Sequence, residues 1–172
     1  MKRLFFALWP DAAGRAECSA VLEKIPLGLA KPVSPVNLHV TLQFLGQVNP
    51  EQEQFLIAAA GQLPISTMSL LFDRLEFWQK PAVLCLSSEH YSSDVSLLAA
   101  DLAAIARQAG LRLDDRLFRP HITLARKAKQ IIALDFKPIV WRSRAFCLVE
   151  SCSGSHGVEY RVLRRWGVAD YC

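Results

Sequence analysis

Residues 38–42, LHVTL, recur almost unchanged as residues 120–124, PHITL, about half a chain length later. Each copy lies in an apolar, β-branched run, which predicts a β-strand. In a strand, the histidine and the threonine two residues later lie on one face, about 6.5–7 Å apart. Only four histidines occur in the chain, and two of them hold equivalent positions in the two copies. The repeat therefore predicts one symmetric site with two imidazoles and two hydroxyls.

These groups are the ones that phosphoryl transfer requires: a base for the nucleophile, an acid for the leaving oxygen, and donors for the remaining oxygens. Histidine suits both roles because its unperturbed pKa is about 6.5. A zinc site is the nearest alternative, but it would need a third ligand. No Asp, Glu or Cys lies within either motif. We therefore expect His39 and His121 to be catalytic, with no bound metal.

Length and composition limit the remaining possibilities. With 172 residues, the chain suits one domain or two small interlocked lobes. Its apolar runs stop well short of the ~20 residues that a membrane span needs. Residues 9–11, WPD, break the short apolar stretch behind Lys2 and Arg3, so a first strand is expected there and not a signal peptide. The five cysteines are scattered and lack zinc spacing. We expect a cytoplasmic protein.

Charge is unevenly distributed along the chain. Residues 1–100 carry 7 basic and 9 acidic side chains, whereas residues 101–172 carry 13 basic and 7 acidic ones. Most of those 13 are arginine, which suits bidentate contacts with phosphate. An ordinary solvated surface would also explain the excess. A basic second half nevertheless fits an anionic partner such as RNA or a nucleotide.

Periodicity and capping signals predict the elements. In the first motif strand, His39, Thr41 and Gln43 share one face, and Val40, Leu42 and Phe44 share the other. A first helix is expected from a cap at Asp11 to about residue 24. A second is expected over 50–60, where Asn49 is the N-cap and Gln52 completes a capping box. A third is expected over 93–109 and is ended by Gly110. Strands are expected over 3–9, 38–45 (ended by Gly46), 68–77 and 82–87 (a hairpin), 118–125, and 141–152 with 158–168 (a pair turned at 153–157).

This order of elements places the motif strands alike in both halves. Strands and helices follow one another as β-α-β-α-β-β-α-β-β-β. The order predicts an α+β protein made of two sheet-and-helix lobes related by a pseudo-twofold axis.

Four segments resemble a known family. They are RLFFAL (3–8), NLHVTLQFLG (37–46), RPHITLAR (119–126) and YRVLRRW (160–166). Together they are similar to the two-histidine phosphoesterase superfamily, and within it to the bacterial RNA 2′,3′-cyclic phosphodiesterases, also called 2′-5′ RNA ligases. The resemblance implies a single bilobal domain over 1–172. Its two lobes would each be an antiparallel sheet with outer helices, around a central cleft, with no metal and no cofactor.

The resemblance also implies roles for named residues. A ribonucleoside 2′,3′-cyclic phosphate would be opened to a 2′-phosphate, with His39 as proton donor and His121 as proton acceptor. Thr41, Thr123 and Arg126 would bind the phosphate. The reverse reaction, 2′-5′ joining of RNA, is allowed as well. The partner would be RNA or a nucleotide ending in a 2′,3′-cyclic phosphate. Neither a membrane nor a protein partner is implied, and we expect a monomer.

Two positions depart from this family pattern. Many relatives carry a tryptophan in the strand that reads VLCL at 83–86 here, and Arg119 stands where a histidine or a small residue is commoner. The competing hypothesis is an RNA-binding module with vestigial catalytic motifs. Both histidines and both threonines are intact, which argues against it, because a binding module has no need of both an acid and a base.

Overall fold

The computed structural model describes residues 1–114, 116–154 and 157–168. Their elements follow the chain in the order β1 (Lys2–Leu8), α1 (Ala12–Glu23), β2 (Lys31–Pro32), the short 3-10 helix η1 (Pro35–Asn37), β3 (Val40–Val48), α2 (Pro50–Ala60), β4 (Met68–Phe72), β5 (Arg74–Trp78), β6 (Val83–Ser87), β7 (His90–Tyr91), α3 (Ser93–Gln108), β8 (His121–Arg126), β9 (Ile139–Ser143), β10 (Ala145–Gly154) and β11 (Gly157–Gly167).

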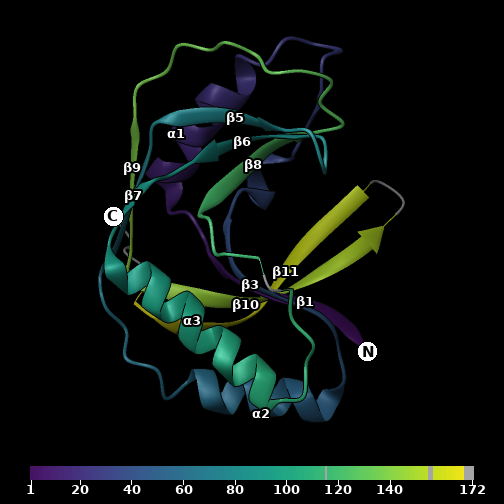
Figure 1. The fold of residues 1–172 in the computed structure, drawn as a ribbon, viewed down its shortest axis with the longest axis vertical. Coiled ribbons are helices and arrows are strands. Elements are labelled where there is room, and N and C mark those ends of the chain that lie inside the picture. The colour runs from purple at the N-terminus through teal and green to yellow at the C-terminus, as the bar shows by residue number, and fades with distance from the viewer. Residues whose placement is uncertain (115, 155–156, 169–172) are drawn as a thin grey trace.

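The central sheet joins two four-stranded halves (Figure 1). Strands β11, β10, β1 and β3 form what we call the His39 half, and β8, β6, β5 and β2 form the His121 half. The strand pairings of this sheet are antiparallel, and the halves meet where Val40 of β3 pairs with Ile122 of β8. Each half thus presents its motif strand at the junction. The predicted α+β fold with two related lobes is confirmed.

The helices cover one side of this sheet. Helices α2 and α3 lie together along the His39 half, with α3 against β3, whereas α1 packs against β8 of the other half and against β9 (Figure 1). Asp11 caps α1 by accepting from the Gly14 amide, and Asn49 and Gln52 form the predicted capping box. Most buried side chains lie between helices and sheet. The opposite face has a small cluster of its own: Phe5, Ala7, Cys147 and Val149, with Trp9 and Tyr160 packed against it.

Two predicted strands are each divided between two sheets. The strand expected over 68–77 breaks at Asp73 into β4 and β5, and the strand expected over 141–152 breaks at Arg144 into β9 and β10. Strands β7, β4 and β9 form a separate three-stranded sheet, whereas β5 and β10 join the central one. Alternation of polar and apolar residues indicates which residues are buried, but not which neighbour a strand pairs with. The points at which these strands pass from one sheet to the other could therefore not be predicted from the sequence.

Two boundary predictions also need correction. Gly46 does not end its strand: β3 continues to Val48, with Gly46 at φ +74° beside a one-residue register shift against β1. A second register shift against β1, between Phe6 and Ala7, makes Leu42 the extra residue of a β-bulge and reverses the alternation. Phe44 therefore pairs with Phe5 and is exposed, instead of sharing the buried face of Val40 and Leu42. The second motif strand begins at His121 and not at residue 118. The predicted turn at 153–157 includes residues 155–156, which lie outside the described residues.

No helix among the described residues is long and apolar enough to span a membrane.

Candidate active site

The two motif histidines are anchored in the same way. Nδ1 of His39 donates to the Asn37 carbonyl at 2.6 Å, and Nδ1 of His121 donates to the Arg119 carbonyl at 2.8 Å. A carbonyl can only accept, so Nδ1 carries the hydrogen in both rings. Nε2 is therefore the nitrogen left for chemistry in each. In both motifs the anchor is the residue two positions earlier, which reproduces the sequence repeat at the level of hydrogen bonds.

The register between the motif strands gathers the four motif side chains on one face. Val40 and Ile122 are paired and fully buried, so their neighbours point to the other side of the sheet. Because the strands are antiparallel, His39 lies across from Thr123, and Thr41 lies across from His121. Nε2 of His39 is also 3.2 Å from the hydroxyl of its own Thr41. The register thus places both imidazoles and both threonine side chains on the same face of the sheet.

Arg126 reaches this face through a β-bulge. It comes three residues after Thr123 and would face the opposite way in a regular strand. Against β6, however, Thr123 pairs with Cys85 while Ala125 pairs with Leu84, so Leu124 is the extra residue of the bulge. Arg126 is thereby turned to the histidine side, and its charge lowers the pKa of His39.

Aromatic rings surround His39. The Trp9 ring stacks on the imidazole at 5.6 Å between centroids with 12° between planes, and the Phe5 and Tyr160 centroids lie at 5.0 and 4.9 Å. Burial among these rings lowers the pKa of His39 to about 4, against the opposing effect of the Asn37 hydrogen bond. The charge of His121 lowers the pKa of His39 as well, so the two imidazoles resist double protonation.

His121 has a different environment, built on Trp78. The two ring centroids are 4.5 Å apart, and the Arg119 guanidinium lies 5.2 Å from the centre of the Trp78 ring. Glu76 holds both neighbours, accepting from Trp78 Nε1 and from Arg119 Nη2, each at 2.7 Å. Burial and the charge of Arg119 lower the pKa of His121. Both shifts favour the neutral imidazole before an anion binds.

Trp78, Glu76, Trp9 and Tyr160 are neighbours of the site that the sequence alone does not reveal. Strand 83–86 lacks the tryptophan of many relatives, but Trp78 pairs with Val83 across the hairpin and provides an aromatic ring from the adjacent strand. Arg119 holds the His121 ring through its carbonyl and packs on Trp78 through its guanidinium. The contacts of Trp78 with His121 and Arg119 join residues that are far apart in sequence, so only the pairing of the strands could have revealed them.

The site supplies acid–base groups and donors but no evident set of metal ligands. Within the described ranges, no group of three or more His, Cys, Asp or Glu side chains is placed to hold a metal ion. Cys85 is paired with both Glu76 and Thr123 by register, and burial raises the pKa of its thiol to about 12, so it is an unreactive neighbour.

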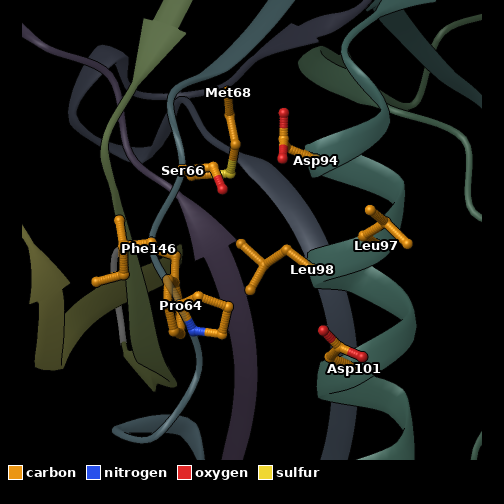
Figure 2. A pocket seen from close by; sticks show the side chains of 9 residues that line it. Pro64, Ser66, Met68, Asp94, Leu97, Leu98, Asp101 and Phe146 are labelled. Atoms are coloured by element: carbon orange, nitrogen blue, oxygen red, sulfur yellow. The ribbon is translucent and has the colours of Figure 1, made fainter.

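A separate pocket lies on the helix side of the sheet (Figure 2). Apolar side chains of Met68, Leu98 and Phe146 line it, and Asp94 and Asp101 of α3 lie beside them. It contains no histidine, threonine or arginine, so it is unrelated to the motif residues.

Comparison with known proteins agrees with this geometry. The family model described as "LigT like Phosphoesterase" matches twice, over residues 8–85 and 86–158, so that each match contains one motif. The RNA 2′,3′-cyclic phosphodiesterase of Escherichia coli strain K12 is 30% identical over 170 residues, covering 97% of both chains. The enzyme of the same name from Thermus thermophilus is 28% identical over 184 residues, covering 96% of this chain and 90% of its own length.

Solved structures match equally well. The crystal structure of E. coli LigT complexed with 3′-AMP superposes with a TM-score of 0.88 at 30% identity, covering 97% of this chain and 98% of that one. The same protein complexed with phosphate gives a TM-score of 0.84 at 29% identity, covering 98% of each chain.

Proposed function

The chain belongs to the LigT-like phosphoesterase family, and from this premise we propose that it is a metal-independent RNA 2′,3′-cyclic phosphodiesterase that produces 2′-phosphomonoesters. The observation that carries the proposal is the pair of identically anchored imidazoles, His39 and His121, on one sheet face with two hydroxyls. The relatives named for this activity supply its substrate class.

The proposed reaction is an acid–base displacement at phosphorus. Nε2 of neutral His121 accepts a proton from water as the water oxygen bonds to phosphorus. The bond from phosphorus to the ribose 3′-oxygen breaks, and protonated His39 donates its Nε2 proton to that oxygen. The product retains phosphate on the 2′-oxygen. Thr41, Thr123 and Arg126 bind the nonbridging oxygens, where negative charge develops.

Joining of RNA ends by a 2′-5′ bond would use the same groups, with the 5′-hydroxyl of a second strand attacking phosphorus in place of water. Hydrolysis is favoured in water, so we propose ligation as a minor activity. The other candidate, an RNA-binding module with vestigial motifs, has no use for the shared Nδ1 anchoring, which leaves Nε2 available in both rings. We further propose a single bilobal domain that acts as a cytoplasmic monomer, because the pseudo-twofold partner of each lobe lies in the same chain.

The direct test is hydrolysis of adenosine 2′,3′-cyclic phosphate by protein treated with EDTA. We expect adenosine 2′-phosphate as the product and an unchanged rate after chelation, because the protein itself supplies acid, base and oxyanion donors. Formation of the 3′-phosphate, or a loss of rate restored by zinc or manganese, would contradict the proposed mechanism.

The lowered pKa values predict an acidic optimum. The productive state has one protonated and one neutral histidine. In the enzyme without substrate, its population falls when the pH rises above the pKa values of the two histidines. Burial lowers the pKa of His39 to about 4 and also lowers that of His121. We therefore expect kcat/KM to peak below pH 6.5 and to fall as the pH rises. The optimum of kcat should lie higher, because a bound anion favours the protonated ring.

Arg119→Gln provides the internal check on this pH profile. The Arg119 charge lowers the pKa of His121, and its removal also leaves Glu76, which raises that pKa, without its cation. The alkaline limb of kcat/KM should move to higher pH in the variant. An unmoved or acid-shifted limb would show that this limb does not report the histidine pair.

A further inference from the structure

The histidine face continues past His39 into an exposed aromatic and cationic surface. Phe5, whose ring contacts His39, is paired with Phe44 of β3, so both rings rise from the same side of the sheet. Phe5 is buried, whereas Phe44 is 46% exposed. Arg3, two residues before Phe5 on β1, places its guanidinium carbon 5.1 Å from the centre of the Phe44 ring. We call Phe44 and Arg3 the Phe44 platform.

Arg3 of this platform and Arg119 of the other half differ in their salt bridges. On the other half of the sheet, Arg119 also stacks on an aromatic ring, but Glu76 neutralises it at 2.7 Å. No corresponding salt bridge joins Arg3 to a carboxylate in the part of the chain that the structure describes. An exposed arginine held over an exposed ring, without a counter-ion, is suited to a ligand that has both a flat apolar face and a negative charge.

Nucleic acid is the ligand with that combination, and the chemistry of the substrate fixes its direction. A 2′,3′-cyclic phosphate occupies the 3′ end of an RNA strand, so the rest of the strand must leave the site from the 5′ side of the last ribose. Arg3 lies about 6.5–7 Å further along β1 than Phe5, the residue in contact with His39. The platform is thus within the reach of a neighbouring nucleotide.

We propose that the Phe44 platform binds the nucleotide preceding the cyclic end, with its base stacked on Phe44 and its phosphate paired with Arg3. The inference rests on the proposed function and makes it more specific. The preferred substrate is an oligonucleotide, and a free cyclic mononucleotide lacks part of the available binding energy. Base–aromatic stacking in single-strand binding proteins is large enough to change affinity by roughly 5- to 100-fold.

The experiment compares adenosine 2′,3′-cyclic phosphate with a hexaadenylate that ends in a 2′,3′-cyclic phosphate. The wild-type protein should have the higher kcat/KM on the hexamer. Phe44→Ala should lower the hexamer-to-monomer ratio of kcat/KM by roughly fivefold or more, and Phe44→Trp should retain it. Arg3→Gln should lower the ratio too, with a weaker dependence on salt, because one phosphate contact is lost.

Two matched controls lie on other surfaces. Phe55 of α2 is 42% exposed, and Arg142 of β9 is exposed in the three-stranded sheet, so Phe55→Ala and Arg142→Gln should leave the ratio unchanged. A wild-type ratio near one would overturn the proposal. An equal loss of kcat/KM on both substrates in Phe44→Ala would also overturn it, because Phe44 would then act on the site of the cyclic phosphate and not on the preceding nucleotide.

A binding measurement separates this inference from the proposed activity. The probe is a 5′-fluorescein hexaadenylate with a terminal 2′-phosphate, followed by anisotropy. If the wild-type protein hydrolyses neither substrate, the proposed function fails. The platform still stands if Phe44→Ala and Arg3→Gln weaken binding of this probe at least fivefold while the controls do not. Equal binding by all five proteins would refute it.

Discussion

Replacing either His39 or His121 by alanine is expected to lower kcat/KM on a 2′,3′-cyclic nucleotide by roughly 10²–10⁴-fold, the range for loss of a general acid or base. Each ring holds its hydrogen on Nδ1 and leaves Nε2 for the reaction, so alanine removes a proton carrier together with its hydrogen bond to the main chain. Steady-state kinetics with circular dichroism as a check on folding would measure the effect.

The double variant and a third histidine complete this test. Loss of both rings should be far less severe than the product of the single effects, because acid and base act as one unit. His90 lies exposed in β7 and serves as the control, so His90→Ala should be near neutral. If either motif histidine can be removed from a folded protein with less than about a tenfold loss, paired acid–base catalysis is wrong.

Gly167→Ala should destabilise the fold strongly, by roughly 3–5 kcal/mol. Gly167 ends β11 at φ +90°, and a Cβ at this position would lie 2.0 Å from the Arg144 carbonyl oxygen. That atom is backbone and cannot turn away, so the pairing of Gly167 with Ala145 has to shift. A left-handed conformation alone costs about 1–3 kcal/mol for a non-glycine residue, and the clash adds to it. Urea unfolding would measure the difference in the free energy of unfolding.

Gly28→Ala separates the two contributions. Gly28 has a similar φ of +82°, but nothing lies within 4 Å of the Cβ it would gain. This variant should lose only the conformational part, about 1–2 kcal/mol. Comparable losses in the two variants would contradict the contact assigned to Gly167.

Local signals were enough to predict much of the fold. The cap at Asp11 and the capping box of Asn49 and Gln52 are made by residues within one helical turn, so their pattern can be read in sequence. Gly110, at φ +77°, ends the long helix as expected. The motif strands were recognisable for the same reason, because Val40 and Ile122 alternate with polar neighbours over a few residues.

Errors arose where the outcome depended on a distant strand. Nothing local marks Asp73 or Arg144 as the residue at which a strand leaves one sheet for another. The β-bulges likewise depend on the strand with which each segment pairs. Phe44 was expected on the face of Val40 and Leu42, yet a register shift against β1 turns it to the other side. In the same way, the extra residue Leu124 turns Arg126 toward the histidines. A shift of one residue reverses the face of every side chain that follows.

The sequence by itself determined the candidate acid–base groups, because the repeated His-x-Thr spacing places an imidazole and a hydroxyl on one face of any strand. Tertiary structure alone decided their setting: the rings around His39, the Trp78 and Glu76 support beside His121, and the platform of Arg3 and Phe44. The physical reason is range. Strand alternation acts over two residues, whereas pairing, burial and the resulting pKa values depend on which distant strands meet.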